Sequence, residues 1–167
     1  HAAVKQSPFM MIITDLEGVI TFVNPRFTEI TGYTSEEVVG QNVRILKGGI
    51  ASSQDYDSIW STILAGNSWS GIFNNRKKNG ESYWESAVIS PIKDANGRIT
   101  HFLSVKEDIT STKKIEIDLQ TTNANLSALL ENTTEVIWSI NDKYEIIQLN
   151  SAFRESFYSF FGVYLKP

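Results

Sequence analysis

Short runs rich in β-branched and other apolar residues, near the start of the chain, indicate β-strands. Two such runs, IITD at residues 12–15 and VITFV at residues 19–23, are separated by a Leu-Glu-Gly turn, which predicts two antiparallel strands in a hairpin. Asn24 and Pro25 then predict the start of a helix, because an Asn side chain caps free backbone N–H groups and Pro is tolerated at the first helical position. We expect this helix to end at Gly32.

Two more helices are predicted before the next strands. A Thr-Ser-Glu-Glu sequence starting at Thr34 fits a capping box and predicts a short helix that ends by Gly40. A longer helix is predicted over residues 53–66, because its apolar side chains recur at the spacing of one helical face. That apolar face consists of Tyr56, Ile59, Trp60, Ile63 and Leu64. We expect it to cover a sheet.

Three further strands are predicted from Trp69 onward, separated by turn signals at residues 78–80 and 94–97. In the last strand the residues expected to share one side are Ile99, His101, Leu103 and Val105. The order of two strands, short helices, one longer helix and three strands predicts an α+β domain on an antiparallel sheet.

The chain contains an internal repeat. IITDLEGVITFVNPRF at residues 12–27 aligns without gaps with WSINDKYEIIQLNSAF at residues 138–153, an offset of 126 residues that pairs Asn24 with Asn150. The second copy has no room here for the long helix or the last three strands. We therefore expect residues 132–167 to be the N-terminal part of a second, truncated domain, with a hairpin, the start of a helix and unpaired sheet edges.

The segment between the two copies, residues 109–131, is predicted to be a helix with the seam of a coiled coil. The seam positions, spaced four and three residues apart, are Ile115, Leu119, Thr122, Leu126 and Leu129. The centre of the segment is a Thr-Thr-Asn sequence, which is a poor helix former. We predict a short, imperfect coiled coil between two copies of the chain, with a passive linker as the alternative.

Composition and charge narrow the classes of function. The chain has 167 residues, 41% of them hydrophobic and 20% charged, as in an ordinary folded protein. Its net charge of −4 offers no positive field to phosphate groups, so no nucleic-acid partner is expected. No apolar run approaches the roughly 20 residues of a membrane-spanning helix, and no secretion signal opens the chain. A cytoplasmic location is expected, with the cytoplasmic part of a larger, membrane-associated protein as the alternative.

The residues that could carry out chemistry form no catalytic or metal-binding pattern. The absence of Cys excludes disulfides, thiolate metal sites and a thiol nucleophile. His101 has no second His or Cys nearby with ligand spacing, so no metal site is expected. No carboxylate pair is placed for acid–base work, and residues 108–131 contain no His that could accept a phosphoryl group. We expect no enzymatic activity in this chain.

Two long motifs resemble the bacterial PAS (S-box) sensory family. They are ITDLEGVITFVNPRFTEITGYTSEEVVGQN and NRKKNGESYWESAVISPIKDANGRITHFLSVKEDIT, and the resemblance covers residues 4–112. It implies the PAS fold, a five-stranded antiparallel sheet with helices over one face and a small pocket, followed by a signalling helix. Asp108-Ile109-Thr110 matches the family's terminal Asp-Ile-Thr, where the sheet leads into that helix. The expected domains are a sensory domain at 1–108, a linker helix at 109–131 and the partial second domain at 132–167.

The resemblance allows several cofactors, and two of them conflict with the residues present. The photosensory flavin branch has Asn-Cys-Arg-Phe-Leu-Gln where this chain has NVRILK at residues 42–47. Val43 replaces the Cys that forms the flavin adduct, Lys47 replaces a flavin-facing Gln, and Glu85 stands where that branch has Asn, so adduct chemistry is excluded. The haem branch needs an axial His on the longest helix, and residues 53–66 contain none.

A redox-sensing FAD branch is compatible with the sequence. It resembles this chain in RILKGG at residues 44–49, WSG at 69–71 and NRKK at 75–78. In that branch aromatic side chains stack on the isoalloxazine ring and amides bond to its polar edge. The candidate pocket or FAD-binding residues are Trp69, Asn75, Tyr83 and Glu85, with Asn42 and Trp60 as weaker candidates. The same motifs occur in PAS domains with no known ligand, so a pocket with no cofactor or an unknown ligand stays open.

The resemblance leads to a hypothesis about function. We expect a module that detects a small ligand, a redox state or a partner, and relays the change through the helix after Asp108 to an output domain outside this chain. The expected output domain is a histidine kinase, and a diguanylate cyclase is the alternative. The alternatives are an FAD-binding redox sensor and a ligand-free dimerisation module. The expected partners are a second copy of the chain, through residues 109–131, the output domain of the same polypeptide and a possible small-molecule ligand.

Overall fold

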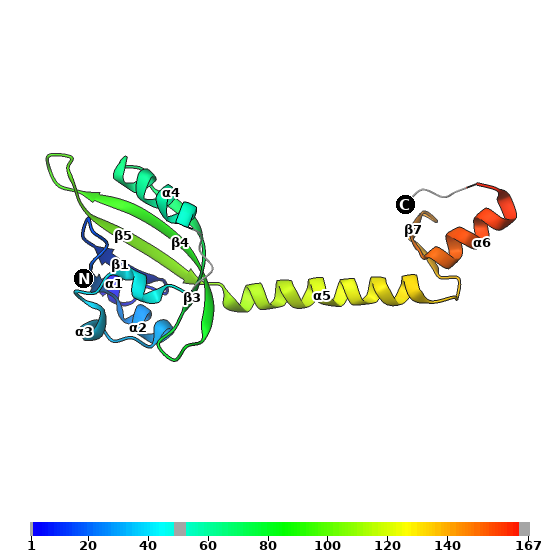
Figure 1. Ribbon diagram of the computed structural model, residues 1–167, viewed down its shortest axis with the longest axis horizontal. Coiled ribbons are helices and arrows are strands. Elements are labelled where there is room, and N and C mark those ends of the chain that lie inside the picture. The colour runs from blue at the N-terminus through cyan, green and yellow to red at the C-terminus, as the bar shows by residue number, and fades with distance from the viewer. Residues whose placement is uncertain (1, 49–52, 164–167) are drawn as a thin grey trace. The chain divides into compact units, whose positions relative to one another are not determined.

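A five-stranded antiparallel sheet forms the centre of the first part of the chain. The computed structural model describes residues 2–48 and 53–163. The strand order is β2-β1-β5-β4-β3, so the first strand lies beside the last one in the middle of the sheet (Figure 1). The strands are β1 (Met10–Thr14), β2 (Ile20–Val23), β3 (Trp69–Arg76), β4 (Ser82–Lys93) and β5 (Ile99–Asp108). The five strands and their antiparallel pairing agree with the sequence prediction.

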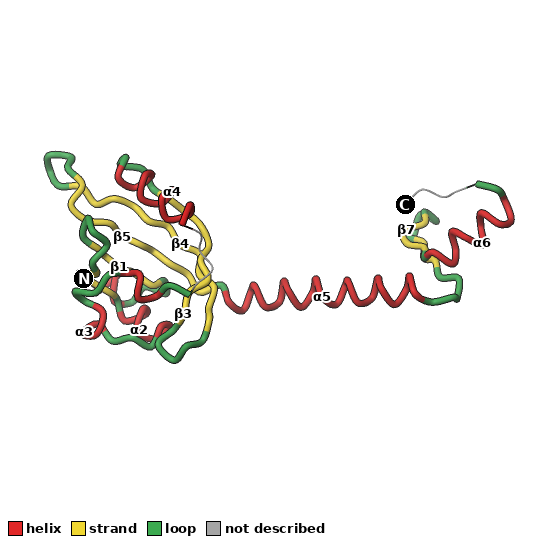
Figure 2. The backbone as a smooth tube through the Cα atoms, in the orientation of Figure 1, coloured by secondary structure: helices red, strands yellow, loops and turns green. Residues whose placement is uncertain are grey.

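Helices pack on the inner face of this sheet (Figure 2). One cluster joins β1 and β2 to Phe27 and Val38, and a second joins Ile59 and Ile63 to Phe102 of β5. The helices of this part are α1 (Ala2–Lys5), α2 (Pro25–Thr31), α3 (Ser35–Val38), the 3₁₀ turn η1 (Val43–Leu46) and α4 (Ser53–Leu64). Burial of these apolar faces is the main stabilising contribution to the fold.

The predicted helix ends are present in the structure. Asn24 caps α2 by accepting a hydrogen bond from the Phe27 N–H, and Gly32, with φ of 78°, ends the helix in the left-handed region. Thr34 and Glu37 form the capping box of α3. The hairpin turn before β2 is held by the Asp15 carboxylate, which accepts the N–H groups of Glu17 and Val19 at 2.9 and 2.8 Å.

The alternation expected in the last strand is interrupted near its start. His101, Leu103 and Val105 alternate with the inward-facing residues, but Ile99 packs against the buried cluster under α4. The reason is a register shift at Ile92 and Lys93 of β4, which changes which side of β5 a residue faces. The inner face of β5 is instead formed by Phe102, Ser104 and Lys106.

The chain divides into two compact units, residues 1–113 and 114–167. A single helix, α5 (Thr110–Asn132), begins in the first unit and ends in the second. The second unit also contains β6 (Trp138–Ile140), β7 (Ile146–Leu149) and α6 (Ser151–Phe161), with β6 and β7 forming a two-stranded antiparallel sheet. The hairpin and helix expected in the second copy are therefore present. Among the described helices, none combines the length and the apolar character needed to cross a membrane.

The second copy exposes positions that the first copy buries. Ile12 is 0% exposed, whereas Trp138, its equivalent at the repeat offset, is 52% exposed. Ile20 is 1% exposed and its equivalent Ile146 is 50% exposed. In the first copy these side chains pack in a cluster with Val38, Leu46 and Tyr83, and the described residues of the second copy include no equivalents of these three.

Candidate functional site

A cavity of about 80 Å³ lies between the inner face of the sheet and α4. This volume holds several water molecules or one small organic molecule. Its floor comes from β3, β4 and β5, and its other walls come from α4 and the segment around η1. The aromatic lining residues are Tyr56, Trp60, Phe73 and Phe102. The charged lining residues that the structure describes are all basic: Arg44, Lys47 and Lys106.

A glycine of the first hairpin turn lies beside Trp60. The indole ring of Trp60 packs edge-to-face with Phe102, with ring centroids 5.8 Å apart. A Cβ atom on Gly18 would lie 3.4 Å from the Trp60 ring, and Gly18 has a φ of 82°, which L side chains rarely adopt. The β1–β2 turn therefore needs glycine for its backbone, and a Cβ atom at this position would lie in ordinary van der Waals contact with the Trp60 ring.

Three of the six predicted site residues line this cavity: Asn42, Trp60 and Asn75. The polar groups of Asn42 are already engaged, since its oxygen accepts the Arg44 N–H at 3.1 Å and its amide nitrogen donates to the Glu17 carbonyl at 3.0 Å. Asn42 thus fixes the cavity wall by joining η1 to the first hairpin. Trp60 supplies an apolar surface and Asn75 supplies a polar one.

The other three predicted residues, Trp69, Tyr83 and Glu85, lie outside the lining of the cavity. The Trp69 ring folds along its own strand over Gly71, where a Cβ atom would lie only 2.3 Å from the ring, and its centroid is 5.2 Å from that of Phe73. The Trp-Ser-Gly motif is therefore a packing arrangement in this structure. Tyr83 is fully buried in the cluster beneath α2.

Glu85 is the centre of a buried polar network next to the cavity. Its side chain is 0% exposed, yet it carries a carboxylate, which is costly to bury unless it is paired and hydrogen-bonded. Lys106 forms an ion pair with Oε1, the Asn75 amide donates to the same oxygen at 2.8 Å, and the Tyr83 hydroxyl donates to Oε2 at 2.9 Å. Three donors and one positive charge thus satisfy the carboxylate.

The environment keeps Tyr83 protonated. Burial raises the pKa of its hydroxyl far above the ordinary value, and the adjacent negative charge of Glu85 raises the pKa further. The hydroxyl is therefore a permanent donor to Glu85 at any neutral pH.

Sequence reasoning missed Lys106, Ser104 and the two phenylalanines of the lining, Phe73 and Phe102. A lysine near the end of a strand ordinarily points to solvent, but the strand alternation places Lys106 on the same side as Phe102, and its side chain is only 6% exposed. The available signal was this alternation, but which of the two faces of β5 lies inward depends on how the sheet packs, which the sequence does not reveal.

The polar network is joined to the start of α5 through the backbone of β4. Trp84, the neighbour of Glu85, accepts the Ile109 N–H at 2.9 Å and donates its own N–H to the Thr110 hydroxyl at 2.9 Å. Asp108 caps the helix by accepting the Thr110 N–H at 2.9 Å, and Glu85 lies opposite Asp108 in the pairing of β4 with β5. The cavity, the buried carboxylate and the first turn of α5 are consequently contiguous.

Comparison with known proteins agrees with this architecture. A sequence model of the PAS domain family matches residues 8–111, more than half of the chain. The chain belongs to the PAS domain family. The sensory fold that the two motifs imply is thus present, with its five-stranded sheet and its helices.

The relatives of this PAS domain include signalling proteins. The chain is 26% identical over 151 residues to a nitrogen fixation regulatory protein of Klebsiella pneumoniae, covering 90% of this chain and 30% of that protein. It is 36% identical over 130 residues to a blue-light-activated histidine kinase of Brucella canis, covering 76% of this chain and 27% of that protein. The chain thus spans less than a third of the length of these curated relatives.

A solved structure supports the fold. The structure of an RNA-binding light-oxygen-voltage receptor matches with a TM-score of 0.66 at 24% sequence identity, covering 74% of this chain and 36% of that chain. At this identity the match concerns the arrangement of the strands and helices alone.

Proposed function

We propose that this chain is a sensory relay module in which a change in the cavity alters the start of α5, and thereby an output domain of the same polypeptide. The observation that carries the proposal is a pair of hydrogen bonds next to the buried carboxylate of Glu85: the Ile109 N–H donates to the Trp84 carbonyl, and the Trp84 N–H donates to the Thr110 hydroxyl. In this proposal, a ligand that disturbs the bonds of Glu85 shifts the adjoining β4 backbone, to which the first turn of α5 is bonded.

A histidine kinase is the output domain that the comparisons favour. The chain is 36% identical to proteins named blue-light-activated histidine kinase, although it spans 27% of their length. The chain itself carries the sensory part, and we propose no catalytic residue within it. A cytoplasmic location fits this role and stays a prediction.

We also propose that α5 forms a homodimer. Its seam positions project apolar side chains to solvent, with exposures of 69% for Ile115, 59% for Leu119, 53% for Leu126 and 70% for Leu129. A lone helix of 23 residues with a Thr-Thr-Asn centre is marginal in water. Parallel pairing with a second copy would bury the seam, and would let a change at Thr110 alter the crossing or register of the helices.

An FAD-binding redox sensor is the second candidate, supported by Asn75, Trp60 and Asn42 on the cavity wall. The geometry fits this cofactor only in part. The amide nitrogen of Asn75 is engaged by Glu85, the Trp69 ring lies over Gly71, and a cavity of about 80 Å³ must widen to admit a three-ring system. An absorption spectrum of freshly purified protein tests this candidate, because bound flavin colours the protein yellow.

Hydrogen exchange tests the relay without any ligand. Ser104→Met places a larger side chain in the cavity, and Val105→Met is the matched control on the opposite side of β5. We expect Ser104→Met to change the exchange rates of the Ile109 and Lys113 amides about fivefold or more, within the usual range of coupling between sites, and Val105→Met to leave them unchanged. Equal rates in the two variants would show that the cavity and α5 are uncoupled, as in a ligand-free dimerisation module.

A further inference from the structure

Lys106 has hydrogen-bonding capacity that the protein does not use. A lysine ammonium carries three N–H donors. Among the described residues, its partners are the Glu85 carboxylate and the ring of Phe73, whose centroid lies 5.4 Å from the Lys106 nitrogen. The side chain is 6% exposed and lines the cavity. At least one N–H donor therefore faces the space where a ligand would lie.

The charge of Lys106 is already balanced by Glu85. The positive and negative charges of this ion pair cancel, and both side chains are buried, so the pair is a neutral unit within the protein. An anionic ligand would bring a second negative charge to one ammonium group in a site with little water, which is unfavourable. Arg44 and Lys47 are exposed at the cavity, so water and salt screen their charges. The site therefore favours an uncharged acceptor over an anion.

The remaining groups indicate the shape and polarity of that ligand. The aromatic walls suit a flat ring, and a volume of about 80 Å³ is well below the usual range of pockets for drug-sized molecules, about 300–1,000 Å³. Near Lys106, the amide nitrogen of Asn75 donates to Glu85, and among the described residues no hydrogen bond to its side-chain oxygen is found, so that oxygen is an acceptor for a ligand. The lining also includes the hydroxyl of Ser104, which both donates and accepts.

We propose that Lys106 is a ligand-binding residue that donates to an uncharged carbonyl group, and that the cavity takes a small, single-ring aromatic carbonyl compound such as an aryl amide. The carbonyl oxygen of the ligand accepts a hydrogen bond from Lys106, and an N–H group of the ligand donates to the side-chain oxygen of Asn75. This inference rests on the proposed function, because it names what occupies the cavity of the relay. When the ligand accepts a hydrogen bond from Lys106, it weakens the ion pair between Lys106 and Glu85. Glu85 is the neighbour of Trp84, whose backbone bonds to the start of α5.

Matched pairs of uncharged and anionic probes test the proposal. Binding of benzamide, benzoate, nicotinamide and nicotinate to isotope-labelled full-length chain is followed by NMR titration, using shifts of amides on β3, β5 and α4. We expect each amide to bind the wild type about tenfold or more tightly than its carboxylate partner. The amide gains a hydrogen bond from Lys106, which is worth about a factor of ten, whereas the carboxylate loses this gain to repulsion by Glu85. In Glu85→Gln the negative charge that neutralises Lys106 is removed, so we expect benzoate to bind more tightly than benzamide.

A double variant provides the control for Lys106. Lys106→Met alone leaves Glu85 unpaired, so it is combined with Glu85→Gln to remove both charges together. We expect this double variant to keep the wild-type circular dichroism spectrum and to lose benzamide binding about tenfold or more. Wild-type preference for the carboxylates, no reversal in Glu85→Gln, or full benzamide affinity in the double variant would each overturn the proposal.

Two more outcomes separate the ligand class from the relay. Absence of binding by all four probes, or binding of lumiflavin alone, would overturn the ligand class, while the hydrogen-exchange response to Ser104→Met would still stand. Selective binding of the amides together with no exchange response would uphold the ligand class and overturn the relay.

Discussion

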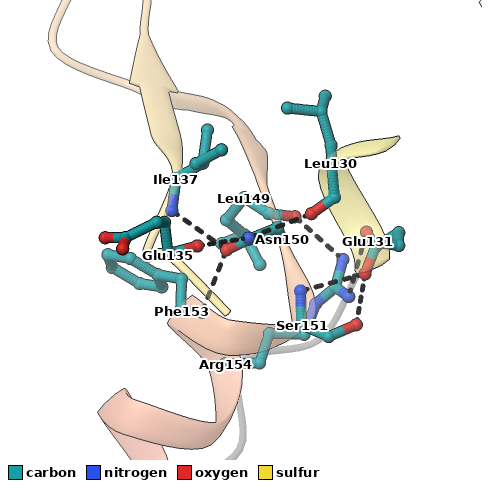
Figure 3. A network of polar contacts seen from close by, with 9 residues as sticks. All are labelled: Leu130, Glu131, Glu135, Ile137, Leu149, Asn150, Ser151, Phe153 and Arg154. Atoms are coloured by element: carbon teal, nitrogen blue, oxygen red, sulfur yellow. Dashed lines mark hydrogen bonds and ion pairs between the residues drawn. The ribbon is translucent and has the colours of Figure 1, made fainter. Parts of the chain in front are cut away.

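Asn24 and Asn150 make the same four hydrogen bonds at equivalent positions of the two copies. Each side-chain oxygen accepts two backbone N–H groups, each amide nitrogen donates to two carbonyl groups, and both side chains are 1% exposed. The partners of Asn24 are Met11, Phe27, Val4 and Phe9. The partners of Asn150 are Ile137, Phe153, Leu130 and Glu135, and Figure 3 shows them around its side chain. Every partner is displaced by 126 residues.

This equivalence assigns two roles to α5. Val4 lies in α1, the helix that precedes the first strand of the first copy, and its equivalent Leu130 lies in the last turn of α5. The helix that starts at the end of the first PAS domain is therefore also the helix that precedes the first strand of the second copy. A relay along α5 would reach Asn150 directly.

Loss of the Asn24 side chain should destabilise the first unit. Asn24→Ala removes a helix cap and leaves buried backbone groups without partners, so we expect a loss of about 2–3 kcal/mol in the free energy of unfolding. Asn24→Asp keeps the acceptor and loses the two donors, and we expect a smaller loss. Urea denaturation followed by tryptophan fluorescence measures both. Equal stabilities of Asn24→Ala and wild type would contradict the structural role.

Loss of the Asn150 side chain should act on the second unit alone. We expect Asn150→Ala to raise the hydrogen exchange of β6 and α6, because the same cap and bridging bonds are lost there. Amides of β1 and β5 provide the internal control and should be unchanged. Faster exchange in both sheets would show that the two copies unfold together.

Stability should fall at alkaline pH because of Tyr83. Its pKa is raised in the folded chain by burial and by Glu85, so the folded state binds the proton more tightly than the unfolded state does. The stabilisation is complete below the unfolded pKa of about 10 and is lost as the pH rises above it. Tyr83→Phe lacks this proton, so its loss of stability above pH 10 should be smaller than that of the wild type. Denaturation midpoints across the alkaline range measure the difference.

Acid should weaken the contact between α5 and α6. Hydrogen bonds from Ser151 lower the pKa of Glu131, and the positive charge of Arg154 lowers it further. Glu131 lies in α5, whereas Ser151 and Arg154 lie in the first turn of α6. The stabilisation is present above the unfolded pKa of the carboxyl group, near 4.5, and is lost as the pH falls through the folded pKa. We expect the protection of the Ser151 amide, measured as its exchange rate relative to the intrinsic rate at the same pH, to fall at acid pH in the wild type. Glu131→Gln should show this reduced protection already at neutral pH.

The seam of α5 should control association. We expect light scattering to give about twice the mass of one chain for the wild type, and one chain for Leu119→Glu combined with Leu126→Glu, because charges in the seam cannot be buried. Thr121→Glu with Ala128→Glu adds the same charges outside the seam and should stay dimeric. A wild-type chain that is monomeric at high micromolar concentration would rule out dimerisation through α5.

Local patterns in the sequence determined the elements of this protein. Hairpin turns, helix caps and apolar spacing are properties of neighbouring residues, so the sequence alone predicts the strands, α2, α3, α4, α5 and the repeat that pairs Asn24 with Asn150. The motifs also identified the family. The short α1 and η1 and the side on which Ile99 lies were not predicted.

The cavity was decided by contacts between residues far apart in the chain. The pairing of β5 with β1 and β4, and the packing of α4 on one face of that sheet, set which β5 side chains lie inward, and with them the position of Lys106. Trp69 and Glu85 have the chemistry of cofactor-binding residues, yet the ring of Trp69 covers Gly71 and the carboxylate of Glu85 is fully used by Lys106 and its neighbours. A side chain's chemical type is local, but its partners depend on strand register and packing, which only the folded chain defines.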